Sequence, residues 1–197
     1  GVLYTGAYVS GEQRKQLIVD VKGIKIAILG YLDHLNGFPG EYQPEQINMY
    51  TEELVAADIA EAKAEGADFI LVYMHWGTEN TTKLTSAQKQ QAKFVADAGA
   101  DIIIGSHTHC PQGTENIETD RGTVPVFYSL GNVISSMARD INNDTAFVNI
   151  SLEKDAAGKT SIVSLTYTPA FCTRTDAGRF VLIPADADSV SDRNLKA

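Results

Sequence analysis

The fold of this chain is decided by residues 100–109, which read Ala100-Asp101-Ile102-Ile103-Ile104-Gly105-Ser106-His107-Thr108-His109. Three branched apolar residues in succession indicate a buried strand, and Gly105 ends it. His107 and His109 follow at positions i and i+2, where the side chains of an extended chain point the same way. Both imidazoles are therefore expected to face one point, and neutral imidazole is a common metal ligand.

A second apolar run, residues 68–74, ends in the same way, in His75-Trp76-Gly77. Three of the four histidines thus follow apolar strands, and ligands bind at that edge of open α/β sheets. A single histidine after a strand is usually structural, but three at equivalent strand ends favour a shared metal site. The spacing leaves its chemistry open, because three imidazoles also fit a zinc hydrolase with an open fourth position.

The remaining elements indicate one α/β domain with a β-rich end and no domain linker. The predicted strands lie over residues 16–21, 24–30, 68–74, 102–104, 124–128, 145–153, 161–168 and 179–183. Apolar spacing predicts a helix over 47–64, and Thr85 is expected to cap a second helix that runs to residue 98. A helix between two apolar strands favours parallel pairing. Residues 31–44, which include His34, and residues 110–122 are expected to be loops.

The composition is that of an ordinary globular chain: 197 residues, 44% hydrophobic and 21% charged. The net charge of −9 gives no electrostatic basis for binding nucleic acid. The chain would also repel a polyanion unless a basic patch or a metal intervened. Cys110 and Cys172, the only cysteines, make no disulfide framework, and Cys110 is interpreted as a small buried filler. No stretch has the length and hydropathy of a membrane span.

Three motifs in this chain resemble those of a known family. They are His75-Trp76-Gly77-x-Glu79, then Gly99-Ala100-Asp101 through Gly105-x-His107-x-His109, then Tyr128-Ser129-Leu130-Gly131-Asn132. In order and spacing they are similar to the C-terminal motifs of the CapA family, the poly-γ-glutamate capsule biosynthesis proteins, also called PgsA. The resemblance implies a calcineurin-like metallophosphoesterase fold. That fold is an α/β (α+β) sandwich of two sheets flanked by helices, with a two-metal site at the strand ends.

The resemblance also assigns roles to individual residues. It implies four catalytic groups, of which the histidines are metal ligands: His75, Glu79, His107 and His109. It assigns substrate binding to three further residues: Trp76, Gln112 and Asn132. The expected cofactors are divalent metal ions, Mn, Fe or Zn, which would clamp a phosphate and lower the pKa of a bridging water.

The family's first motifs, Gly-Asp, Asn-Leu-Glu and Asn-Asn-His, are absent and are expected upstream of Val2. We therefore interpret residues 1–197 as a single domain that is the C-terminal portion of a CapA-like domain, with the N-terminal part missing. In the phosphoesterases that half supplies further ligands. A two-metal site is accordingly expected only in the complete domain, and this chain alone is expected to bind metal weakly.

The sequence leaves the function open between three hypotheses. The first is an enzyme of capsule or poly-γ-glutamate metabolism that hydrolyses a phosphoester or a polymer linkage with the help of metal. The second is a non-catalytic binding or scaffolding subunit of a polymer synthesis or export complex. The third is a carbohydrate- or peptide-binding envelope domain in which Trp76 and Tyr128 stack on a ligand, although both rings equally fit core packing.

The resemblance further implies partners and a location. The expected partners are poly-γ-glutamate or another envelope polymer and membrane synthase subunits, with no nucleic acid. The expected location is extracytoplasmic in the cell envelope. The protein is expected to be membrane-anchored there through the missing N-terminal segment.

Overall fold

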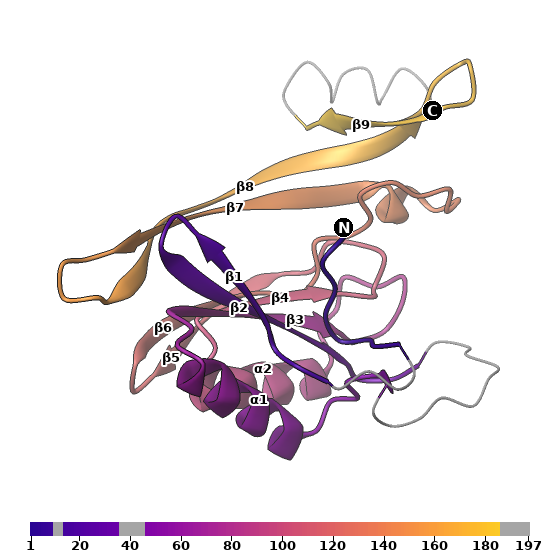
Figure 1. Ribbon diagram of the computed structural model, residues 1–197. Coiled ribbons are helices and arrows are strands. Elements are labelled where there is room, and N and C mark those ends of the chain that lie inside the picture. The colour runs from indigo at the N-terminus through magenta and orange to yellow at the C-terminus, as the bar shows by residue number, and fades with distance from the viewer. Residues whose placement is uncertain (10–13, 36–45, 186–197) are drawn as a thin grey trace.

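The computed structural model describes residues 1–9, 14–35 and 46–185. These residues form three layers: two helices, a six-stranded sheet and a three-stranded sheet. Figure 1 shows the helices on one face of the larger sheet and the smaller sheet above its other face. The predicted α/β sandwich is therefore observed, and the predicted loop over 31–44 lies outside the described residues from position 36 onward.

The larger sheet contains six strands: β1 (Leu17–Val21), β2 (Ile24–Leu32), β3 (Phe69–His75), β4 (Ile102–Ser106), β5 (Thr114–Thr119) and β6 (Gly122–Phe127). Their spatial order is β1-β2-β3-β4-β6-β5. The four central strands are parallel and the two edge strands are antiparallel. A helix connects β2 to β3 and another connects β3 to β4, which permits parallel pairing, whereas β5 lies between β4 and β6 in the chain. Burial on both faces explains why β3 and β4 are nearly continuous apolar runs.

Two helices, α1 (Glu52–Ala64) and α2 (Ser86–Ala98), cover one face of the larger sheet (Figure 1). Each begins at a threonine N-cap, because a side-chain oxygen there satisfies a free backbone N–H of the first turn. Thr51 caps α1, and Thr85 forms with Gln88 the reciprocal capping box that the sequence predicts. In the described part of the chain, no helix is long and apolar enough to cross a membrane.

Two predictions of local structure are corrected. Helix α1 begins after Thr51 rather than at residue 47, since the preceding residues are extended and Met49 bridges to Leu32 beside β2. The segment 110–122, predicted as a loop, contains strand β5, which pairs with β6 along its whole length. Only Ile117 of β5 is buried, so this edge strand has almost no apolar alternation to reveal it.

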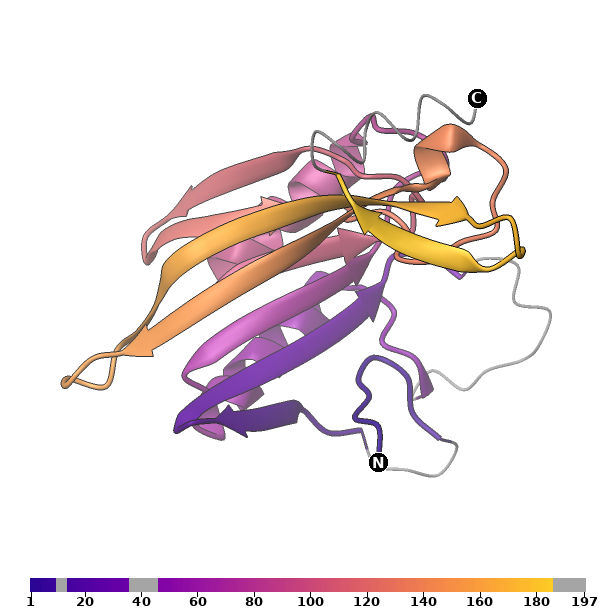
Figure 2. The same cartoon turned by 90° about the horizontal axis from the view of Figure 1, so that it is seen from above.

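The smaller sheet consists of β7 (Asp144–Lys154), β8 (Thr160–Arg174) and β9 (Phe180–Pro184), antiparallel in that order. Figure 2, seen from above, shows β7 and β8 lying across the larger sheet. Side chains from β7 and β8, including Ile150 and Leu165, pack there against residues of β3, β4 and β6. The predicted hairpin that joins β7 to β8 is confirmed.

The parallel strands bring their carboxyl ends to one edge of the larger sheet. In the strand register Leu32 at the end of β2 pairs with His75, and His75 pairs with Ser106 at the end of β4. The residues that directly follow these strands are therefore neighbours in space. Polar side chains that are far apart in the sequence can therefore lie close together at this edge of the sheet.

Candidate functional site

Four histidines meet at the carboxyl edge of the larger sheet, and we call them the histidine cluster: His34, His75, His107 and His109. The ring centroids of His75 and His107 lie 4.3 Å apart, and those of His34 and His107 lie 4.5 Å apart. His109 lies 6.2 Å from His107. The proximity expected for His75, His107 and His109 is therefore observed.

His34 joins the histidine cluster although the sequence indicates only a loop residue there. Its Nε2 atom lies 3.0 Å from Nε2 of His107, so one ring donates a hydrogen bond to the other. The signal that identifies His34 is its place just after β2, the strand end next to that of His75. Between them, the N–H of Asp33 donates to the carbonyl of His75 at 2.9 Å, and the amide of Gln91 donates to the Asp33 carboxylate at 2.9 Å.

The backbone is strained where the histidines sit. Among the described residues, four that are not glycine have positive φ, and three of them belong to this site: Asn80 at 59°, His107 at 91° and His109 at 60°. Such conformations cost about 1–3 kcal/mol each and persist where the surroundings enforce them, which is common at functional sites. The positive φ values at His107 and His109 also show that the turn after β4 is not the extended segment expected from the sequence.

Burial keeps two of the imidazoles neutral. Desolvation lowers the pKa of His75, and the neighbouring His34 and His109 lower it further. Desolvation lowers the pKa of His107 to about 4, with His75 and His34 adding to the effect. A neutral imidazole has one nitrogen with a free lone pair, so near pH 7 each ring can accept a hydrogen bond or bind a metal.

His109 is held by Asn132 and faces Glu79. Its Nδ1 atom lies 3.0 Å from Oδ1 of Asn132. Its Nε2 atom, on the other side of the ring, lies 3.7 Å from a carboxylate oxygen of Glu79. Asn132 therefore contacts His109, a predicted metal ligand. A carboxylate oxygen of Glu79 lies near the other nitrogen of the same ring.

Trp76 does not face the site, contrary to the expected role in substrate binding. Its side chain is fully buried and stacks on Tyr128 with ring centroids 5.6 Å apart. Its indole N–H donates to the carbonyl oxygen of Tyr128 at 2.8 Å. Both rings therefore belong to the core, and neither is available to stack on a ligand.

Gln112 is also buried, and its amide is used within the protein. Its Oε1 accepts a hydrogen bond from Gln88 at 2.8 Å, and its Nε2 donates to the carbonyls of Thr81 and Lys83. The expected contact with substrate is therefore replaced by a structural role. Gln112 ties the start of α2 and the loop after Glu79 to the turn after β4.

Comparison with known proteins identifies the family. The model of a family described as "Bacterial capsule synthesis protein PGA_cap" matches residues 1–137. The chain belongs to this family. It is 33% identical over 165 residues to the "PGA biosynthesis protein CapA" of Bacillus subtilis (strain 168), covering 83% of this chain and 42% of that protein. It is 30% identical over 167 residues to the "Capsule biosynthesis protein CapA" of Bacillus anthracis, covering 82% of this chain and 40% of that protein.

The chain thus spans about two fifths of the length of the curated relatives that it matches. Among solved structures it is similar to the NAD nucleotidase NadN of Haemophilus influenzae, with a TM-score of 0.51 and 15% identity over 93% of this chain and 33% of that chain. This likeness concerns the fold alone. It confirms the predicted fold class, an α/β sandwich of two sheets flanked by helices.

The donor set of this PGA_cap chain fits a divalent metal. Nε2 of His109 and a carboxylate oxygen of Glu79 lie 3.7 Å apart, and both are atom types that bind divalent metals. Metal–nitrogen and metal–oxygen bonds are about 2.0–2.2 Å, so one cation could contact both atoms across their 3.7 Å separation. Within residues 1–9, 14–35 and 46–185, however, no group of three or more His, Cys, Asp or Glu side chains is already arranged to hold a metal ion.

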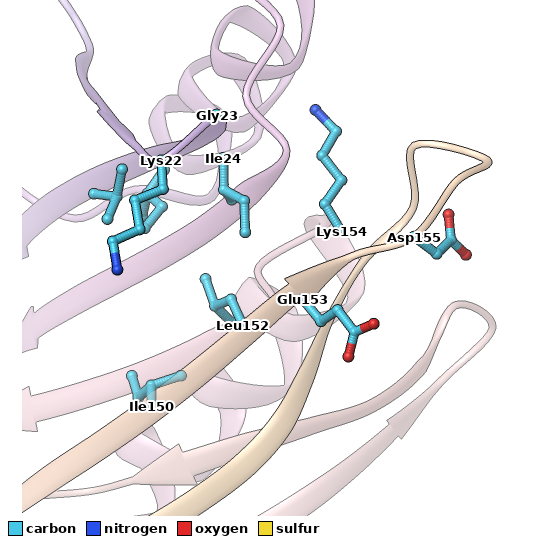
Figure 3. Close-up of a pocket in the computed structure, with 10 residues that line it drawn as sticks. Lys22, Gly23, Ile24, Ile150, Leu152, Glu153, Lys154 and Asp155 are labelled. Carbon is cyan, nitrogen blue, oxygen red and sulfur yellow. The ribbon is translucent and has the colours of Figure 1, made fainter.

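A separate cleft of about 550 Å³ lies between the two sheets (Figure 3). Ile24 of β2 and Ile150 and Leu152 of β7 are among its apolar lining residues, and Lys22 and Asp155 are among its charged ones. Ile24 begins β2 and the histidine cluster lies beyond the end of that strand. The cleft is therefore at the opposite edge of the sheet and does not belong to the candidate site.

Proposed function

We propose that the histidine cluster is the metal-binding part of a metal-dependent hydrolase site, phosphoesterase-like in its chemistry, in a protein of capsule or poly-γ-glutamate biosynthesis. The observation that carries this proposal is the convergence of four imidazoles from three neighbouring strand ends. The positive φ values at His107 and His109 support it, because strained backbone of this kind is common at functional sites. The ligands we propose are His75, His107 and His109, with His34 as an additional donor.

Each group of the site has a distinct task in this proposal. A bound divalent cation would act as a Lewis acid on a phosphoryl or carbonyl oxygen. The low pKa of His75 and of His107 keeps their lone pairs free for that cation at neutral pH. Glu79, half-exposed beside His109, is the group we assign to hold a proton during the reaction.

The charge of the chain is relevant to the proposed substrate, poly-γ-glutamate or another envelope polymer. Poly-γ-glutamate is a polyanion, and this chain has a net charge of −9. Like charges disfavour their association. A divalent cation at the histidine cluster would supply local positive charge, so metal binding and polymer binding are expected to be coupled.

For the whole protein we propose an extracytoplasmic place in the cell envelope, with a membrane anchor in a segment that precedes residue 1. Membrane subunits of a polymer synthase are the proposed protein partners. These assignments rest on membership in the capsule synthesis family.

Metal titration tests the proposal. The chain is titrated with Mn²⁺ by isothermal calorimetry, and hydrolysis of bis(p-nitrophenyl) phosphate is followed at each metal concentration. Because this chain is expected to carry only part of the ligand set, we expect weak but saturable Mn²⁺ binding. His107→Ala is expected to abolish it, and Asn116→Ala, an exposed change on β5, to leave it intact.

The calorimetry also separates the two main hypotheses. Mn²⁺ binding accompanied by metal-dependent hydrolysis supports the hydrolase. If Mn²⁺ produces no heat above the His107→Ala baseline, the metal-dependent site is refuted and the non-catalytic binding or scaffolding subunit becomes the better proposal.

A further inference from the structure

We propose that Asn132 is a positioning residue that fixes the tautomer of His109, with the proton on Nδ1 and the lone pair of Nε2 directed toward the histidine cluster. A role of this tautomer in metal binding depends on the proposed metal-dependent site, whereas the contact between Asn132 and His109 does not. In this role Asn132 positions a histidine of this chain and does not make the substrate contact that the sequence suggests.

The orientation of the Asn132 amide follows from its neighbours. One end of the amide lies 3.1 Å from the carbonyl oxygen of Asn142 and 3.3 Å from the carbonyl oxygen of His109. Carbonyl oxygens only accept hydrogen bonds, so this end must be the NH₂ group. The opposite orientation would place an oxygen against two oxygens. The atom that faces the His109 ring is therefore Oδ1, an acceptor.

The tautomer of His109 follows from the amide. Nδ1 of His109 lies 3.0 Å from this acceptor, so Nδ1 must carry the hydrogen. A neutral imidazole has one N–H, and Nε2 is therefore left with a lone pair. That lone pair lies on the side of Glu79, 3.7 Å from its carboxylate oxygen, where two acceptors face each other. A hydrogen bond of this kind on the far nitrogen fixes the tautomer of metal-binding histidines generally.

Asn132 also holds the backbone of His109, and it shares this task with Asn142. The side-chain amides of both residues donate to the carbonyl oxygen of His109, at 3.3 Å and 3.1 Å. These two bonds fix the turn in which His109 has a φ of 60°. Of these two asparagines, Asn132 is the one that contacts the ring. Asn142 is therefore a matched control, because its loss removes a backbone contact and leaves the ring contact in place.

Asn132 lies in the turn after β6, the strand that pairs with β4. Pro111 and Leu130 form an antiparallel bridge, and Gly131 bridges to Thr145 at the start of β7. The two bridges lay the turn after β6 alongside the turn that carries His109. A side chain added at Gly131 would meet the carbonyl oxygen of Asp144 at 2.3 Å, so glycine is required for this approach.

Nitrogen NMR of the metal-free chain tests the proposal directly. The uniformly ¹⁵N-labelled protein is studied at about pH 8, above the ordinary imidazole pKa, by long-range ¹H–¹⁵N correlation of the imidazole rings. His109 is expected to show a protonated Nδ1 and an unprotonated Nε2. In Asn132→Ala the proton is expected to move largely to Nε2, whereas Asn142→Ala retains it on Nδ1.

Mn²⁺ affinity supplies a second readout. Asn132→Ala is expected to weaken Mn²⁺ binding about 10- to 100-fold, and Asn142→Ala to change it much less. Backbone amide spectra of each variant report whether the fold is kept. A wild-type His109 protonated on Nε2 would overturn the inference without any variant. An equal tautomer shift in Asn142→Ala would also overturn it, since the cause would then be the backbone.

The two proposals fail separately in these experiments. If His109 has the inferred tautomer but the chain does not bind Mn²⁺, the proposed function is refuted and the role of Asn132 stands. If the chain binds Mn²⁺ but Asn132→Ala does not change the His109 tautomer, the role of Asn132 is refuted and the proposed function stands.

Discussion

Replacing Gly105 by alanine is expected to destabilise the chain more than any glycine substitution in an open position. A Cβ atom there would lie 2.1 Å from the carbonyl oxygen of Tyr128 and 2.4 Å from Nε1 of Trp76. These two atoms form a buried hydrogen bond of 2.8 Å. The nearest contact is backbone, so a side-chain rotation cannot relieve it. Glycine at this point lets β4 lie against the Trp76–Tyr128 pair directly before His107.

Two effects set the magnitude for Gly105→Ala. Overpacking of a core costs about 1–3 kcal/mol. Loss of the buried hydrogen bond between Trp76 and Tyr128 adds about 1–3 kcal/mol for the groups left without a partner. The free energy of unfolding is therefore expected to fall by about 2–6 kcal/mol, a large fraction of the stability of a typical domain.

Urea unfolding followed by far-ultraviolet circular dichroism measures this change. Gly113→Ala is the control, because an added Cβ at Gly113 meets no atom within 4 Å and its φ is not positive. The control is expected to change the free energy of unfolding by about 0.5 kcal/mol or less. If Gly105→Ala costs less than about 1 kcal/mol, the reasoning about this contact is refuted.

Three further outcomes are expected. First, the metal-free chain loses stability as the pH falls from about 6.5 toward 4, because the folded state holds the pKa of His107 at about 4 and the unfolded state binds its proton near 6.5. Urea midpoints measured against pH should show a loss of up to about 3 kcal/mol that His107→Gln removes, and an unchanged slope in that variant would contradict the assignment. Second, Thr85→Ala removes the side-chain cap of α2 and is expected to lower the free energy of unfolding by about 1 kcal/mol in the same assay. No change in that free energy would show that the Gln88 side chain alone is enough to cap the helix. Third, Glu79→Gln is expected to lower kcat for bis(p-nitrophenyl) phosphate about 100-fold or more, while Glu118→Gln on the exposed edge strand has no effect; equal rates in both variants would exclude Glu79 from the chemistry.

The central strands and the histidines after them are predictable because their signals are local. An apolar run followed by a histidine indicates both the strand and its polar end, as at His75 and His107. Parallel pairing then brings the strand ends together. His34 is not recognisable as a partner because its own loop has no motif, and only the pairing of β2 with β3 places it beside His107.

Burial could not be inferred for the residues next to the site. Trp76 and Gln112 stand beside predicted ligands in sequence, yet both side chains turn into the core, where they satisfy hydrogen bonds. Asp58, which interrupts the apolar face of α1, is buried for a similar reason. Its carboxylate accepts a hydrogen bond from Tyr31 at 2.8 Å and pairs with Arg14, contacts between segments that no local pattern reveals.

The histidine cluster is assembled from parts of the chain that are distant in sequence. His34, His75, His109 and Asn132 lie at or just after the ends of four different strands, and they meet only after the parallel strands have paired. Contacts of this kind form late in folding, because the long loops between them must close first. A partly folded chain therefore lacks the cluster, and a cation that binds there binds the native state alone. At 100 times its dissociation constant, a cation bound at the proposed site would add about 2.7 kcal/mol to stability, so metal supply would also set how much of the chain stays folded.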